Sequence, residues 1–153
     1  MSRIYTTGTI QRPVGEVFDY VTTPGYWPKW HPSSLGVVGA IDHSLEPGEQ
    51  VTERFTVAGR RGTVVWTVRE RIAPRRWVID GAIVGGGGGT ITYTLTPQSV
   101  NETFFEREFV YPLPNALLAL LDMLVIRRRI RAESAEAVRR LKERLESSST
   151  PRA

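Results

Sequence analysis

Hydrophobic and polar residues alternate with two different periods along the chain. Residues 3–11 follow the period of two that predicts a β-strand. After Pro13, which suits a first helical turn, the apolar residues recur at the spacing of a short amphipathic helix: Val14, Val17, Phe18 and Val21. Pro24 and Pro28 then bracket a second short helical piece, which places Trp27 and Trp30 on one side.

From Gly48 to Tyr111 the pattern returns to a period of two and is cut by four turn signals. These signals are Gly59-Arg60, Ala73-Pro74, the glycines at 85–89 and the segment 97–101. They predict five strands joined as hairpins in an antiparallel meander.

The hairpin turns also predict which residues lie side by side in the sheet. A two-residue turn at Gly59-Arg60 places Phe55 opposite Val64 and Glu53 opposite Trp66, and the later turns extend one row through the neighbouring strands. That row runs in the order Val68, Gly81, Tyr93, Arg107. The inner face then carries the large apolar and aromatic residues, and Trp66, Ile79, Tyr93 and Phe109 are expected to point toward a covering helix.

One long helix is expected from about Asn115 to Leu145 to cover this inner face. Its helically spaced stripe is Leu120, Met123, Ile130, Ser134, Ala137, Leu141 and Leu145. The segment 116–126 is apolar on all sides except at Asp122 and is too short to span a membrane, for which ~20 residues are needed. Its exposure to a dimer partner or to a membrane surface is the alternative to burial within the fold.

Composition limits the remaining classes. The 153 residues, 41% of them hydrophobic, fit one domain, expected over 1–146 with a disordered tail at 147–153. The sequence has no cysteine and its start has no apolar run typical of a signal peptide, which favours a cytoplasmic location. The net charge is +4, but the arginines near the end alternate with glutamates at helical spacing, as on a solvated helix face, so no nucleic-acid partner is expected.

Polar residues on the predicted inner face and near the tryptophans are the candidates for chemistry. We predict that Arg107, Tyr93 and the gap at Gly81 form the polar end of a ligand site, and the alternative is that Arg107 pairs with an acid of the protein. His31, Tyr93 and Glu70 are the candidates for proton transfer, and Glu53 could also act as a general acid or base if apolar walls raised its pKa. A structural hydrogen bond or ion pair would account for each of them. Two histidines without cysteine predict no metal site, and the glycines at 85–89 lack the lysine of a phosphate loop.

Several segments together resemble a known superfamily. They are RPVGEVFDYVTTPGYWPKWHP, TVRERIAPRRWVIDG, TITYTLTP, FVYPLPNALLALL and RRRIRAESAEAVRRLK, and they cover nearly the whole chain. The sequence resembles the START-like SRPBCC superfamily, in particular its polyketide cyclase/dehydrase-like and coenzyme-Q-binding-like branch. The resemblance implies an α+β helix-grip fold, in which a curved antiparallel sheet, two short helices and a long C-terminal helix enclose a cavity for hydrophobic ligands.

The main functional hypothesis is the binding of a small hydrophobic or aromatic molecule of lipid, quinone or polyketide type. The predicted ligand-binding residues are Trp27, Trp30, His31, Phe55, Trp66, Trp77, Gly81, Tyr93, Arg107 and Phe109. The mouth of the cavity is expected near Trp27, Trp30 and the hairpin loops. A polyketide cyclase or dehydratase that uses the same cavity is the alternative, and a protein-interaction module is a further one. No cofactor is expected, membrane contact is expected to be peripheral at most, and the protein is expected to be a monomer or a homodimer.

Overall fold

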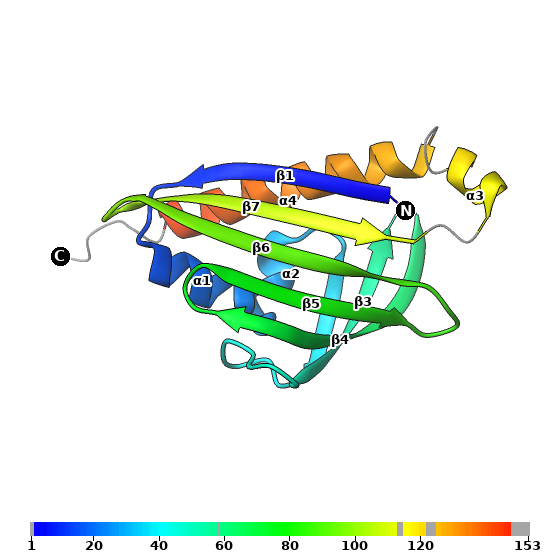
Figure 1. The fold of residues 1–153 in the computed structure, drawn as a ribbon, viewed down its shortest axis with the longest axis horizontal. Helices are drawn as coiled ribbons and strands as arrows, with labels where there is room; N and C mark the ends of the chain where they lie inside the picture. The colour runs from blue at the N-terminus through cyan, green and yellow to red at the C-terminus, as the bar shows by residue number, and fades with distance from the viewer. Residues whose placement is uncertain (1, 58, 113–114, 122–124, 148–153) are drawn as a thin grey trace.

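The computed structural model describes residues 2–57, 59–112, 115–121 and 125–147. Seven strands form one antiparallel sheet in the order β1-β7-β6-β5-β4-β3-β2 (Figure 1). The strands are β1 (Ser2–Ile10), β2 (Ser34–Gly39), β3 (Gln50–Val57), β4 (Arg60–Ile72), β5 (Arg76–Ile83), β6 (Gly88–Ser99) and β7 (Glu102–Tyr111). The helices are α1 (Val14–Thr22), the 3-10 turn η1 (Pro24–Tyr26), α2 (Trp27–Trp30), α3 (Ala116–Leu121) and α4 (Arg127–Ser147).

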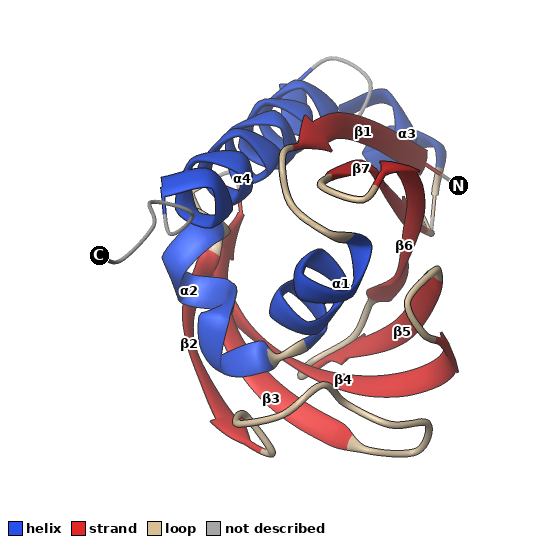
Figure 2. Cartoon of the chain, turned by 90° about the vertical axis from the view of Figure 1, so that its left-hand side faces the viewer, coloured by secondary structure: helices blue, strands red, loops and turns tan. Residues whose placement is uncertain are grey.

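The sheet curls into an incomplete ring, and α4 lies along β1 where the ring is open (Figures 1 and 2). At one end of the ring α1 lies between sheet and helices, and its buried residues Val17, Phe18 and Val21 join the main core (Figure 2). The fold is therefore the expected α+β helix-grip arrangement, because an amphipathic helix buries its apolar stripe against the apolar face of a sheet.

Helix α4 buries the stripe that its sequence predicts. Ile130, Ser134, Ala137, Leu141 and Leu145 are all buried. The opposite side of the helix carries arginine–glutamate pairs, among them Arg140 Nε with Glu136 Oε1 at 3.0 Å. Charge pairs at this spacing belong to a solvated face, which accounts for Arg139, Arg140 and Lys142.

The predicted register is correct between β6 and β7 and shifted elsewhere. Tyr93 lies opposite Arg107, as expected. In the β3–β4 hairpin, however, Glu53 lies opposite Val64 and Val51 opposite Trp66, because β4 begins at Arg60, which the prediction had placed in the turn. The shift is two residues, and side chains alternate with a period of two, so the inner face keeps its members. Trp66, Ile79, Tyr93 and Phe109 accordingly face a space that α4 also lines, which confirms their predicted orientation.

A β-bulge between Val68 and Glu70 in β4 changes the face of the residues that follow. After an extra residue the alternation is reversed, so Arg71 comes to lie opposite Trp77. Glu70, predicted on the inner face, instead makes an ion pair with Arg76, with its Oε2 3.2 Å from Arg76 Nε. Both side chains are exposed to solvent by more than a third. The placement of Glu70 among the candidates for proton transfer in the cavity is therefore wrong.

Two other expectations about the elements are corrected. The strand β2 was not predicted, because SLGVVG is short and holds two glycines. The single helix expected from Asn115 to Leu145 is instead two helices, α3 and α4, and Leu117 and Leu120 of α3 are 67% and 49% exposed, although Leu120 was expected in the buried stripe. Asp122 and Met123 lie outside the described residues, as does the expected tail from residue 148 onward, whereas Ser147 belongs to α4.

Candidate functional site

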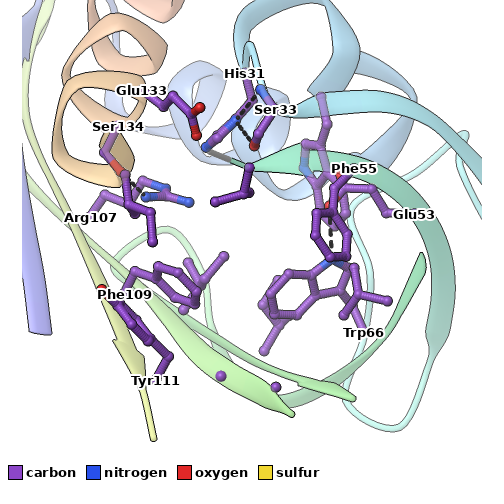
Figure 3. Close-up of a pocket in the computed structure, with 18 of the residues that line it drawn as sticks. His31, Ser33, Glu53, Phe55, Trp66, Arg107, Phe109, Tyr111, Glu133 and Ser134 are labelled. Carbon is purple, nitrogen blue, oxygen red and sulfur yellow. Dashed lines mark hydrogen bonds between the residues drawn. The ribbon is translucent and has the colours of Figure 1, made fainter. Parts of the chain in front are cut away.

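A cavity of about 290 Å³ lies between the inner face of the sheet and the first turns of α4 (Figure 3). This volume is at the lower end of the ~300–1,000 Å³ that is common for small-molecule sites. The apolar side chains of its wall are Trp27, Trp30, Phe55, Val57, Val64, Trp66, Ile79, Ile83, Ile91, Tyr93, Phe109, Tyr111, Ile126 and Ile130. The other lining residues are His31, Ser33, Glu53, Gly88, Gly89, Arg107, Glu133 and Ser134.

One end of the cavity is deep and the other reaches the surface. Trp27 and Trp30 are 5% and 0% exposed, so they belong to the deep end rather than to the mouth where they were predicted. Val57, Ile83 and Ile126 line the other end and are only partly buried. The opening is therefore at the β3–β4 and β5–β6 hairpins, as expected for the hairpin loops, and beside the start of α4.

Three aromatic rings of the wall lie directly against glycine backbone. A Cβ atom built on Gly62 would be 2.6 Å from the Phe55 ring, one on Gly81 would be 2.5 Å from the Trp66 ring, and one on Gly89 would be 2.6 Å from the Phe109 ring. Contacts this short would displace the rings, so only glycine lets them pack this close to the strand backbone. The absence of these three side chains therefore keeps the wall concave.

The predicted slot at Gly81 is wrong for the same reason. Gly81 lies opposite Trp66 and Gly89, not opposite Val68 and Tyr93. The indole of Trp66 covers it, and Trp66 Nε1 donates a hydrogen bond to Glu53 Oε1 at 3.0 Å. Gly81 thus makes room for the Trp66 ring, which lines the cavity, and does not line the cavity itself.

Trp77 is also outside the cavity, although it was predicted to bind the ligand. Its Nε1 donates a hydrogen bond to the carbonyl oxygen of Leu45 at 3.1 Å. Its ring stacks on Tyr93 with the centroids 5.6 Å apart. Trp77 therefore supports the cavity by holding the Tyr93 ring and by tying the β2–β3 connection to the sheet. The other eight predicted binding residues line the cavity, and their part in binding stays a prediction.

Arg107 lies on β7 at the polar end of the cavity and is 4% exposed. Its Nη1 donates a hydrogen bond to Ser134 Oγ of α4 at 3.0 Å, and its guanidinium lies over the Phe109 ring, 5.9 Å from the centroid. Its Nε is buried and has no hydrogen-bond partner among the described residues. Burial raises the pKa of neighbouring Tyr93 to about 12, against the lowering effect of the Arg107 charge, so the Tyr93 hydroxyl stays protonated at neutral pH.

His31 follows α2 and turns its imidazole toward the same end of the cavity (Figure 3). Its Nδ1 accepts a hydrogen bond from the backbone N–H of Ser33 at 3.2 Å and lies 2.6 Å from Ser33 Oγ. Because a backbone N–H only donates, Nδ1 is the acceptor and the neutral ring carries its proton on Nε2. The residue is partly exposed, but Nε2 is buried and has no partner within the described part of the chain.

The environment of His31 keeps the ring neutral. Burial lowers the pKa of His31 well below its usual value, and the charges of Arg107 and Arg140 lower it further. At neutral pH the imidazole therefore presents an N–H donor and no positive charge. Trp30 presents a second N–H donor at this end of the cavity, since its Nε1 is buried without a hydrogen-bond partner among the described residues.

Two carboxyl groups also line the cavity. Burial raises the pKa of Glu53, which accepts the hydrogen bond from Trp66 on the wall opposite Arg107 (Figure 3). Glu133 of α4 lies at the polar end, close to His31 and Arg107 (Figure 3). Among the described residues no group of three or more acidic, histidine or cysteine side chains is placed to hold a metal ion.

Some of the lining residues were not predicted from the sequence. Ile126, Ile130, Glu133 and Ser134 form one helical face, and the spacing that identified Ile130 and Ser134 as buried would have pointed to the other two. Ser33 has no such signal, because its role depends on a hydrogen bond to a ring two residues away.

The sequence over residues 1–146 matches the protein family described as polyketide cyclase / dehydrase and lipid transport, and the chain belongs to that family. No curated protein shows significant similarity to it. Family and fold together define a polyketide cyclase/dehydrase or START-like ligand-binding domain. No helix in the described part of the chain is long and apolar enough to cross a membrane.

Solved structures share the fold at low sequence identity. Protein CV1439 from Chromobacterium violaceum has a TM-score of 0.72 and 16% identity, with 95% of this chain and 99% of that chain covered. A START superfamily protein from Mycobacterium smegmatis has a TM-score of 0.70 and 12% identity, with 96% and 99% covered. The di-domain ARO/CYC BexL from the BE-7585A biosynthetic pathway has a TM-score of 0.70 and 19% identity, with 99% and 48% covered.

Proposed function

We propose that the protein binds one small, largely apolar molecule in the cavity between the sheet and α4. The observation that carries this proposal is the shape of the wall, where Phe55, Trp66 and Phe109 pack directly against glycines and leave a cavity of about 290 Å³ between the sheet and α4. A protein that needed only a stable core would gain by filling this space, since interiors are close-packed. An apolar cavity with a few polar groups at one end is the usual form of a small-molecule site.

The catalytic alternative is a cyclase or dehydratase that uses the same cavity, and one observation favours it. Glu53 is a carboxyl group that lines the cavity and whose pKa is raised by burial, which suits a general acid or base. The other two candidates for proton transfer that line the cavity fit less well. His31 has its pKa moved well below neutrality, and Tyr93 has its pKa moved to about 12. Glu53 is thus the residue to replace when activity on a polyketone is assayed.

Binding is tested by filling the cavity. Val64 lines it and is 3% exposed, so Val64→Phe places a ring in the space, whereas Val100, in the turn before β7, is 84% exposed and Val100→Phe serves as the matched control. We expect Val64→Phe to weaken binding of a fluorescent apolar probe, such as 1-anilinonaphthalene, by tenfold or more, and Val100→Phe to leave it unchanged. Circular dichroism checks that both variants fold. Equal binding by both variants would contradict the proposal, and native mass spectrometry of protein from its own host would identify a retained ligand.

A further inference from the structure

We infer that the polar end of the cavity binds a carboxylate, so that the ligand is an apolar, flat carboxylic acid. The inference rests on the proposed function and names the chemical class of its ligand. It is drawn from three nitrogen donors at this end, Arg107 Nε, His31 Nε2 and Trp30 Nε1.

The three donors are buried and unsatisfied. None of them has a hydrogen-bond partner among the described residues, although buried N–H groups in proteins are nearly always paired. They come from two parts of the fold, since Arg107 lies on β7, whereas Trp30 ends α2 and His31 follows it directly. Arg107 and Trp30 are 4% and 0% exposed, so neither side chain has access to bulk solvent. A ligand with acceptors at this end supplies partners for such donors, whereas a hydrocarbon supplies none.

The charge of Arg107 favours an anionic acceptor over a neutral one. Its partner Ser134 Oγ and the protonated Tyr93 hydroxyl are neutral, whereas the acidic residue Glu133 also lies close to it (Figure 3). His31 is neutral as well and adds a donor without adding charge. A carboxylate has two oxygens that accept several N–H groups, and its bond to a buried guanidinium is charge-assisted.

Glu53 and Glu133 are the carboxyl groups that line the cavity beside this site. Glu53 accepts the Trp66 hydrogen bond on the opposite wall, and its raised pKa favours the neutral form. Glu133 lies at the polar end itself, where its carboxyl group competes with a ligand carboxylate for Arg107, so its neutral isostere should favour an anionic ligand. The Glu133→Gln variant therefore gives a second and opposite test of the charge argument.

The shape of the wall limits the rest of the ligand. Phe55, Trp66 and Phe109 line the cavity with aromatic rings, which pack well against an aromatic body. The volume of about 290 Å³ favours a compact ring system over a two-chain lipid. A bicyclic aromatic acid such as 2-naphthoic acid is a suitable probe, and 2-naphthamide is its neutral isostere.

The test compares these two probes by isothermal titration at pH 7.5. We expect the wild type to bind the acid at least tenfold more tightly than the amide. Arg107→Met should lower the affinity for the acid by tenfold or more and change the affinity for the amide by less than threefold. Glu133→Gln should raise the affinity for the acid several-fold and leave the affinity for the amide unchanged. If Arg107→Met does not fold, the acid-to-amide ratio of the wild type and the effect of Glu133→Gln decide the matter.

The outcomes separate the two proposals. Equal affinity of the wild type for acid and amide, or equal loss of both in Arg107→Met, would overturn the carboxylate site and leave ligand binding intact. A weaker affinity of Glu133→Gln for the acid would overturn it as well. If the wild type binds neither of these probes nor 1-anilinonaphthalene, both the carboxylate site and the proposed function fail.

Discussion

Replacing Gly81 by alanine should destabilise the protein, although alanine is better than glycine in a strand. The new Cβ would lie 2.5, 2.7 and 2.9 Å from three carbon atoms of the Trp66 indole. Trp66 is 7% exposed, so its ring has little room to move except into the cavity. Overpacking of this kind costs about 1–3 kcal/mol, whereas removing the conformational freedom of glycine returns about 0.5–1 kcal/mol. The expected net loss is therefore about 1 kcal/mol in the free energy of unfolding.

The assay is urea denaturation followed by circular dichroism, with a thermal melt that should shift down by ~2–4 °C for each kcal/mol in a chain of this length. Gly15→Ala is the matched control, because it is the same chemical change in α1 and a Cβ there meets no atom within 4 Å. It should stabilise the protein by up to about 1 kcal/mol. A Gly81→Ala variant as stable as the wild type would refute the contact between Trp66 and the glycine backbone.

Two further predictions concern other parts of the core. Trp77→Phe removes the hydrogen bond to the buried Leu45 carbonyl and should cost about 1–3 kcal/mol of unfolding free energy in urea; a loss below 0.5 kcal/mol, roughly the scatter of surface substitutions, would contradict it. Because the pKa of His31 lies below its unfolded value of 6.5, the unfolded chain binds more protons in acid, and stability should fall as the pH drops below 6.5, by at most about 1.4 kcal/mol per pH unit. His31→Gln should lack this part of the slope, and parallel stability profiles for the two proteins would count against a neutral, buried imidazole.

The sequence predicts which face of the sheet a residue occupies better than it predicts which residue lies opposite on the next strand. The inner positions of Trp66, Ile79 and Tyr93 survive a register error because that error is an even number of residues. The residue predicted opposite Gly81 on β6 is wrong, since Gly88 and Gly89, expected in the loop, belong to β6. A turn signal identifies a loop but leaves its ends uncertain by a residue or two, and pair identities depend on those ends.

At the polar end of the cavity, too, some features were predicted correctly from the sequence and others were not. Arg107 and Tyr93 were predicted side by side because the turn between β6 and β7 is short and clearly marked. Glu70 was misplaced because a bulge leaves no mark in the alternation of apolar residues before it. The tautomer of His31 depends on Ser33, and the partner of Arg107 is Ser134 on a distant helix. Such contacts follow from tertiary packing, which no local pattern contains.

The position of α4 along β1 has a consequence for the exposed edge of the sheet. An edge strand presents unpaired carbonyl and N–H groups to which a strand of another chain can add. On β1, α4 supplies donors to such groups: Lys142 Nζ reaches the carbonyl oxygen of Thr9 at 3.1 Å, and Arg127 Nη2 reaches that of Arg3 at 3.2 Å. The helix that covers the cavity thereby also blocks one edge of the sheet. Loss of α4 would expose an apolar inner face and an open strand edge together, which is the combination that promotes aggregation.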